Sequence, residues 1–437
     1  MRKEATTVNM RAHDQLLLLL LKAYALLSPI AFVRLGGNAV TFIDLAMPVA
    51  ALFIVARGLR HVPPTYYIYL AFIACALLSV FFSSSSQVGL AKFVLALRLF
   101  AISAPFALVF LLYDSSVSAM REVVKFALIG MGLAVGIGLL LHMLGIQTAE
   151  SQQIWYQSGG RTVSSYRAAG LVGNSGAYGQ QIAIFGGLLF AARTLSLKVP
   201  TPLAIGGWML VLAGLVVSSS RGGMMMLLIF LFFFLFFRLE RVKEVVVLGI
   251  PVLILGIVAL PLVGAAGLIE TSLNRLDIFN LTGDSRFAQS ARLDTWGMLI
   301  GRIWDVPTFG YGYKSFYDLT GILVDNSFLL TLFEVGMFGL ALFCAFWIVV
   351  VIRLLNDCVT RASPYSALGF ALCMAFVSRM QTGGAHTDWS NAPVVFLVVA
   401  VALRMAQDAR AERRAASREA ARVAQEALRR PGPAPAG

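Results

Sequence analysis

Long apolar runs constrain this chain more than any other feature of its sequence. About twelve runs approach the ~20 residues that a helix needs to cross a bilayer. Only helices and closed barrels span lipid, and barrel strands alternate apolar with polar residues, so we predict helices. The mean hydropathy of +0.81 agrees with this prediction. The expected fold class is an all-α polytopic membrane protein with spans near 16–35, 39–56, 65–82, 90–112, 123–145, 171–192, 201–217, 223–237, 245–263, 325–352, 365–378 and 391–406.

Lysine and arginine in the connections predict the orientation of these spans. Every second connection is basic, as in Arg57 with Arg60, and basic connections favour the cytoplasmic side. Both termini are then cytoplasmic, and because the net charge of +13 follows this asymmetry we predict no nucleic-acid partner. The predicted organisation is helices one to nine in 1–263, a large outer loop with short helices in 264–324, helices ten to twelve in 325–406, and a basic tail with a disordered end in 407–437.

The predicted outer side keeps a set of arginines with few carboxylates nearby in sequence. Each of them either pairs with an acid, or reaches lipid headgroups, or binds phosphate through its planar guanidinium. Arg221 fits phosphate binding best, because small residues flank it in Ser218–Gly223 and no acid is near in sequence. Such a cluster at the lipid boundary suits a lipid diphosphate. The outer arginines are Arg161, Arg167, Arg221, Arg275, Arg286, Arg292, Arg302 and Arg379.

Further candidates lie in the outer connections. Asn174 follows a glycine-rich stretch that either binds an anion by free N–H groups or permits close helix packing. A helix is predicted from Asp284 to Pro307, with Arg292 and Trp296 on one side. His386 is the one histidine predicted outside, and it is a base, a metal ligand or, the favoured interpretation, an ordinary loop residue. No spacing typical of a metal site supports it, so neither a metal nor another cofactor is predicted.

Four sequence motifs in order resemble the O-antigen ligase and polymerase superfamily. They are Ser220-Arg-Gly222, Arg292 before Trp296, Pro307-x-x-Gly-x-Gly312, and Asp325-Asn-Ser-Phe-Leu-Leu-x-x-x-Glu-x-Gly336, and Asn174 also matches. The resemblance covers roughly 160–345. It implies a GT-C-like, inverting, metal-independent glycosyltransferase of the bacterial inner membrane whose active site faces the periplasm. The donor would be an undecaprenyl-diphosphate-linked glycan and the acceptor a glycan or lipid A-core, with membrane lipids as further partners.

The resemblance also assigns roles to single residues. Arg221 and Arg292 would grip the diphosphate, and Asp325 stands before Asn326 where ligases usually carry a histidine that activates the acceptor. Asp325 or His386 would then be the base, and this departure favours a polymerase over a ligase. Diphosphate or glycan binding is predicted for Arg161, Arg167, Asn174, Arg286, Asn326 and Tyr313.

A flippase for lipid-linked saccharides is the alternative from another class. It would need charges along a passage that reaches both leaflets. Within the predicted spans, the sequence shows only Lys22, Lys92 and Arg98.

Overall fold

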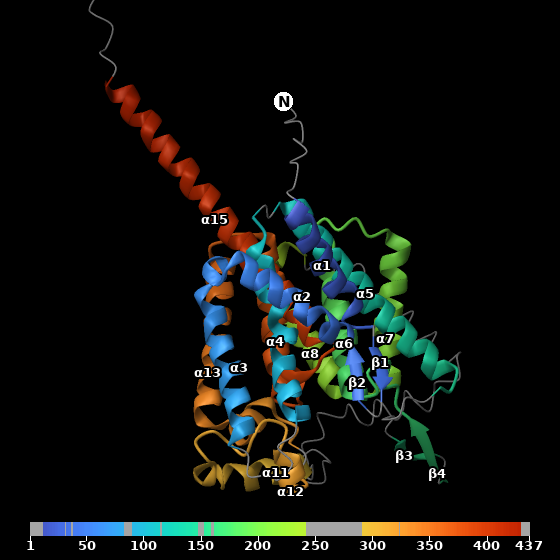
Figure 1. Ribbon diagram of the computed structural model, residues 1–437. Coiled ribbons are helices and arrows are strands. Elements are labelled where there is room, and N and C mark those ends of the chain that lie inside the picture. The colour runs from blue at the N-terminus through green and yellow to red at the C-terminus, as the bar shows by residue number, and fades with distance from the viewer. Residues whose placement is uncertain are drawn as a thin grey trace, which may run out of the picture.

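The computed structural model describes residues 12–30, 32–35, 38–82, 90–113, 116–146, 153–158, 161–241, 291–322 and 324–429. These residues form a helical bundle (Figure 1). The α-helices are α1 (Ala12–Leu27), α2 (Phe42–Arg57), α3 (Pro64–Phe81), α4 (Leu90–Leu111), α5 (Val117–Met143), α6 (Ser175–Ala191), α7 (Thr201–Ser218), α8 (Arg221–Phe237), α11 (Ala291–Ile300), α12 (Phe316–Thr320), α13 (Ser327–Val359), α14 (Pro364–Met380) and α15 (Ala392–Arg429).

Two antiparallel hairpins interrupt the otherwise helical chain. Strands β1 (Phe32–Leu35) and β2 (Asn38–Thr41) pair with each other, and so do β3 (Gln153–Ser158) and β4 (Arg161–Tyr166). The first hairpin corrects the predicted span 16–35, whose helix ends at Leu27. The apolar run continues past Leu27, but Phe32 to Leu35 pair with the next strand instead of extending the helix. Hydropathy alone does not distinguish these two outcomes.

Six helices are long and apolar enough to cross a membrane, counted over the part of the chain that the structure describes: α3, α4, α5, α7, α13 and α15 up to Val423. Helix α8 is apolar but shorter. Helices α2, α6 and α14 coincide with predicted spans within a few residues, whereas the predicted span 245–263 lies outside the described residues. The fold is therefore that of a helical membrane protein, while twelve spans remain a prediction.

Aromatic residues build the core between α3, α4, α13 and α15. The ring centroid of Tyr69 lies 4.8 Å from that of Phe346 and 5.1 Å from that of Phe396. Tyr66 stacks on Phe106 at 5.7 Å, and all of these side chains are buried. Offset and edge-on ring pairs add to the stabilisation from burial itself. This core fixes α13 and α15, whose first residues lie at the same end of the bundle.

The two ends of the bundle differ in what they carry. The first turn of α1 and the projecting half of α15 lie at one end, and α11 and α12 lie at the other (Figure 1). The connections that the sequence predicts to be outside meet at this second end. Phe82 after α3 stacks on Phe309 at 5.0 Å, and Ser327 Oγ at the start of α13 donates to the Gly383 carbonyl after α14. We call it the α11–α12 end.

A break in α13 receives the segment that follows Pro307. Gly336 has φ 83° and ψ −179°, a conformation that is essentially restricted to glycine. The break leaves carbonyls without helical partners, and the segment uses them: Tyr311 N–H donates to Phe333 O at 2.7 Å, and Gly312 N–H to Glu334 O at 3.1 Å. The predicted tenth span is thus two helical pieces with another chain segment docked at their junction.

The predicted loop helix and the predicted basic tail both contain helix in the described residues. The loop helix predicted from Asp284 to Pro307 is described from Ala291 and ends at Ile300, followed by a 3-10 turn, Ile303–Asp305. The basic tail continues the last predicted span as one helix, because α15 runs from Ala392 to Arg429 without interruption. Its alanine, arginine and glutamate residues are strong helix formers, which explains the continuation beyond the apolar part.

Candidate functional site

Three capped helix N-termini lie at the α11–α12 end. The side-chain oxygen of Asn174 accepts from Gly176 N–H and Ala177 N–H at 2.8 and 3.1 Å and so caps α6. Asn326 caps α13 in the same way, with distances of 2.9 and 3.0 Å to Phe328 N–H and Leu329 N–H. Ser220 caps α8 through Gly223 N–H at 3.2 Å. Each N-terminus carries the positive end of a helix dipole, so together they favour an anion.

Arg221 is the first residue of α8, directly after a tight turn. Ser219 ends α7 in the left-handed conformation, with φ 45°. The guanidinium of Arg167 braces this turn from the preceding connection, donating to the carbonyls of Ser218 and Ser219 at 2.9 Å each. Arg167 thereby fixes the place at which Arg221 enters the helix, and two of its N–H groups are used for that purpose.

Glycine brings α6 and α8 into backbone contact next to this turn. A Cβ added to Gly223 would lie 2.6 Å from the carbonyl carbon of Gly179 and 2.8 Å from its Cα. Small residues permit this approach, as they do between membrane helices in general. Of the two interpretations for the glycine-rich stretch, close helix packing is therefore observed.

The loop between α14 and α15 contacts both α13 and α6. Ser327 Oγ donates to Gly383 O at 2.7 Å, and Asn391 Nδ2 donates to Ala177 O at 2.9 Å. One loop therefore contacts the first turns of α13 and α6. Arg379, in the last turn of α14 before this loop, lies against Gly222, the residue that follows Arg221.

His386 lies inside the same loop, in a 3-10 turn, Ala385–Thr387. It is 2 % exposed, its ring lies 5.1 Å from that of Phe343, and its Nδ1 has no hydrogen-bond partner among the described residues. Burial, and second the charge of Lys314, lower the pKa of His386 to about 3. The imidazole is thus neutral and weakly basic, which favours the interpretation as a buried loop residue.

Asp388 follows in the loop as a half-buried residue. Burial raises its pKa, while hydrogen bonds from Ser390 and Asn391 and the charge of Arg379 act in the opposite direction. Its oxygens accept from Ser390 Oγ at 2.7 Å and Asn391 Nδ2 at 2.6 Å. Asp388 therefore shapes the loop that contacts α6.

Several charged residues lie around the docked segment at the break in α13. Lys314 extends its Nζ to 3.5 Å from Thr387 Oγ1, and its backbone N–H donates to the buried carboxylate of Glu334. Lys92 donates to Ser315 Oγ at 2.9 Å and pairs with Asp318 at 2.9 Å. No role in the site was predicted for these charged residues, although Glu334 stands in one of the sequence motifs.

The other predicted site residues are placed as follows. Asp325 is half-buried immediately before the cap Asn326, at the same end as Arg221. Tyr313 is 2 % exposed, so its ring does not offer an open face to a glycan in this conformation. Arg292 lies in α11 and Arg161 in β4, whereas Arg286 lies outside the described residues. No group of three His, Cys, Asp or Glu suited to a metal occurs in the described ranges.

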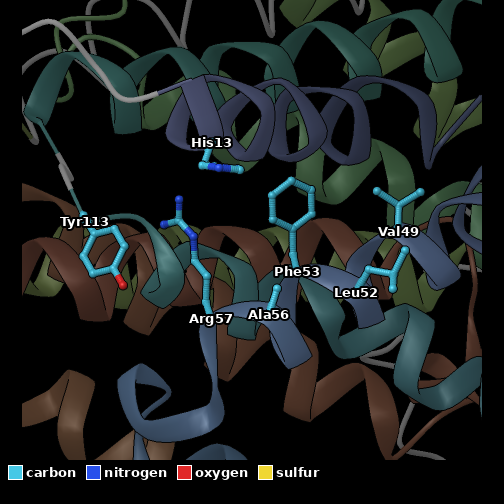
Figure 2. Close-up of a pocket in the computed structure, with 7 residues that line it drawn as sticks. All are labelled: His13, Val49, Leu52, Phe53, Ala56, Arg57 and Tyr113. Carbon is cyan, nitrogen blue, oxygen red and sulfur yellow. The ribbon is translucent and has the colours of Figure 1, made fainter.

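A pocket of about 470 Å³ lies elsewhere, between α1 and α2 (Figure 2). It is lined by His13, Val49, Leu52, Phe53, Ala56, Arg57 and Tyr113. The guanidinium of Arg57 lies 4.6 Å from the Tyr113 ring centroid and pairs with the buried Asp14 at 2.7 Å, so its charge is compensated locally. None of the predicted site residues lines this pocket.

The apolar helices define a multi-pass membrane protein. Within it, residues 206–344 match the family described as O-antigen ligase. This match confirms the resemblance to the O-antigen ligase and polymerase superfamily and supports a function of that general type. It includes Arg221, Arg292 and Asp325, whereas Asn174, Arg379 and His386 lie outside it. Among curated proteins, none matches the chain.

Proposed function

We propose that the protein is an inverting glycosyltransferase of the bacterial inner membrane that joins saccharide units at the periplasmic face. The donor is an undecaprenyl-diphosphate-linked glycan, and the acceptor is a hydroxyl group of another glycan. One observation carries the proposal: Arg221 opens a helix where the N-termini of α6 and α13 also lie, at the end formed by the connections predicted to be outside. In this proposal 264–324 is the periplasmic loop over the site.

The proposed reaction exchanges one bond at the anomeric carbon. The acceptor oxygen attacks that carbon from the face opposite the diphosphate, and the bond between the carbon and the phosphate oxygen breaks. Arg221 and Arg292 neutralise the leaving diphosphate, and Asp325 takes the proton of the acceptor hydroxyl. Guanidinium groups and helix N-termini aimed at the departing charge lower the barrier without a metal ion. Arg167, Asn174 and Asn326 position the elements that bear these groups.

Charges inside the bundle argue against the flippase alternative. Lys22 pairs with Glu122, Arg98 with Asp44 and Lys92 with Asp318. Each of the three cations found within predicted spans therefore has a carboxylate partner, and such pairs hold helices together instead of offering sites to a passing diphosphate. The ligase alternative differs only in its acceptor, lipid A-core, and Asp325 in the place of a histidine favours the polymerase.

The decisive experiment supplies the purified protein in vesicles with an undecaprenyl-diphosphate oligosaccharide. We expect longer chains and released undecaprenyl diphosphate, in the presence of EDTA as well. Arg221→Ala should lower turnover about ten- to a hundredfold, because a charge-assisted contact is worth about 1.5–3 kcal/mol. Arg221→Lys should also lose activity, since an ammonium lacks the bidentate fork.

Three outcomes would contradict the proposal. Movement of the donor across the membrane without chain growth would indicate a flippase, and transfer to lipid A-core alone would indicate a ligase. Full activity of Arg221→Ala would show that Arg221 does not bind the diphosphate. Arg418→Ala, at an exposed position in the far half of α15, is the matched control and should leave turnover unchanged.

A further inference from the structure

We infer that the pocket between α1 and α2 binds one phospholipid of the cytoplasmic leaflet, without selecting for the charge of its headgroup. The pocket has a volume of about 470 Å³, which is within the usual range for small-molecule sites. It lies toward the end of the bundle that carries the first turn of α1, opposite the candidate site (Figure 1). The inference therefore does not rest on the proposed transferase function.

The pocket arises because α1 and α2 pack mainly on different neighbours. Helix α1 packs chiefly on α5, whereas α2 packs chiefly on α4. The two helices meet near the cytoplasmic end that the sequence predicts, where Asp14 pairs with Arg57 at 2.7 Å. They meet again farther along, where the ring centroids of Tyr24 and Phe42 lie 5.5 Å apart. The pocket begins at the first of these contacts and extends along α2 toward the second, so its walls are helices instead of loops.

The lining of the pocket changes from polar to apolar along α2. One end carries the polar side chains of His13, Arg57 and Tyr113 (Figure 2). The other end carries apolar side chains of α2, of which Val49 is the most distant, about 12 Å from Arg57 along the helix axis. A phospholipid of the cytoplasmic leaflet has the same order, with its phosphate at the interface and its acyl chains deeper in the bilayer.

The apolar end of the pocket opens on the exposed side of α2. Leu52 is 69 % exposed and Val49 is 43 % exposed, and both line the pocket. Leu45 and Val55 of the same helix are also exposed. In a bundle that crosses a membrane, an apolar helix surface of this kind faces lipid. An acyl chain therefore reaches the pocket from the side without passing a polar surface.

The polar end of the pocket offers hydrogen-bond donors without a net charge from its ion pair. Asp14 and Arg57 are both largely buried and compensate each other, and Arg57 also donates to the carbonyl of Leu111. The imidazole of His13 and the hydroxyl of Tyr113 can each donate to a phosphate oxygen. Every phospholipid has such oxygens, whatever its net charge. We therefore expect phosphatidylethanolamine and phosphatidylglycerol to bind with similar affinity.

The test measures binding of both phospholipids to delipidated full-length protein in detergent by native mass spectrometry. Ala56→Phe places a phenyl group in the pocket and should weaken binding about ten- to a hundredfold. His13→Leu removes one donor and should weaken binding about two- to tenfold. Val55→Phe is the matched control: it adds the same ring at a position that is 78 % exposed and does not line the pocket, and it should bind normally.

A second measurement keeps the test decisive if Ala56→Phe folds poorly. A lipid that binds only the folded state raises the unfolding temperature by mass action. Phosphatidylethanolamine should therefore raise the unfolding temperature of the wild type and of Val55→Phe by the same amount. His13→Leu changes an exposed residue, so it should fold normally and show a smaller rise.

Three results would overturn the inference. Binding by Ala56→Phe and His13→Leu at the strength of the wild type would show that the lipid binds elsewhere on the lipid-facing surface. Binding of phosphatidylglycerol alone would require an uncompensated cation at the polar end. Stronger binding of undecaprenyl phosphate, added as a third ligand, would assign the pocket to a polyprenyl carrier instead of a phospholipid.

Discussion

His386 illustrates how burial decides the role of a single residue. As the sole histidine predicted on the outer side, it was a candidate base in the sequence. In the structure it packs against Phe343, and burial together with Lys314 lowers its pKa to about 3. A base of that strength accepts protons poorly at neutral pH. Asp325, half-buried before the α13 cap, is therefore the better candidate for the proton of the acceptor.

The depressed pKa of His386 predicts a pH dependence of stability. The unfolded chain takes up the proton near pH 6.5, whereas the folded protein does so only near pH 3. Between these values the unfolded state binds the extra proton, so His386 should destabilise the fold progressively as pH falls. The slope for one proton is about 1.4 kcal/mol per pH unit.

Thermal unfolding in detergent between pH 7 and pH 4 measures this slope for the wild type and for His386→Phe. The phenylalanine keeps a ring against Phe343 and has no titrating group, so its unfolding temperature should fall less steeply. The difference between the two proteins isolates His386 from Asp388, whose raised pKa acts in part of the same range. Parallel curves for the two proteins would contradict this prediction, because they would show that His386 takes up its proton at the same pH in the folded and unfolded states.

At the scale of elements, the break in α13 couples the docked segment to the helix that begins with Asn326. Gly336 allows the carbonyls of Phe333 and Glu334 to bind Tyr311 and Gly312. Lys314 follows directly, with φ 57°, and reaches Thr387 in the α14–α15 loop. The segment after Pro307 is thus held between α13 and the α14–α15 loop.

Gly336→Ala should release this segment. The backbone conformation alone costs a non-glycine residue about 1–3 kcal/mol. A Cβ would in addition lie 2.7 Å from Gly310 N. We expect a lower unfolding temperature, loss of transferase activity and faster tryptic cleavage after Lys314.

Gly321→Ala is the control for Gly336→Ala. It lies in the same segment with φ 66° and nothing within 4 Å, and it should cost about 1–2 kcal/mol without faster cleavage. Equal cleavage in both variants would show that the break does not hold the segment.

The sequence predicts elements better than it predicts their junctions. Apolar runs locate most helices within a few residues, because burial in lipid or among helices needs long apolar segments. The break at Gly336 cannot be predicted from apolar runs, because it depends on hydrogen bonds from Tyr311 and Gly312. The hairpin at Phe32–Leu35 cannot be predicted from them either, because a short apolar run fits either structure.

The same distinction between local features and tertiary contacts applies to the candidate site. Asn174 and Asn326 could have been recognised as caps, because asparagine is favoured directly before a helix. The contacts of Arg379 with Gly176 and Gly222 join residues far apart in the chain. The contact of Lys92 with Ser315 does so too, and spacing gives no hint of either. The sequence therefore predicts local features such as helix caps, but it does not predict contacts between residues that are far apart in the chain.

At the scale of the whole molecule, the candidate site and the projecting half of α15 lie at opposite ends of the bundle (Figure 1). Helices α6, α8 and α13 all begin at the α11–α12 end, where Arg167, Arg221, Arg379 and the three helix caps lie. The projecting half of α15 lies at the opposite end (Figure 1) and carries exposed arginines such as Arg414 and Arg418. Basic segments stay preferentially on the cytoplasmic side, so the arginine-lined site should face the periplasm.

Labelling with a membrane-impermeant thiol reagent tests this orientation in intact cells and in inverted vesicles. The four native cysteines would first be replaced, and single cysteines introduced at Leu319 in α12 and Ala415 in α15, both exposed. Leu319→Cys should react from the periplasmic side and Ala415→Cys only from the cytoplasmic side. Reaction of both from one side would contradict the arrangement in which the α11–α12 end and the projecting tail flank the bilayer. Reaction of Ala415→Cys from outside and Leu319→Cys from inside would place the arginines in the cytoplasm, where the acceptor glycan of the proposed reaction is not presented.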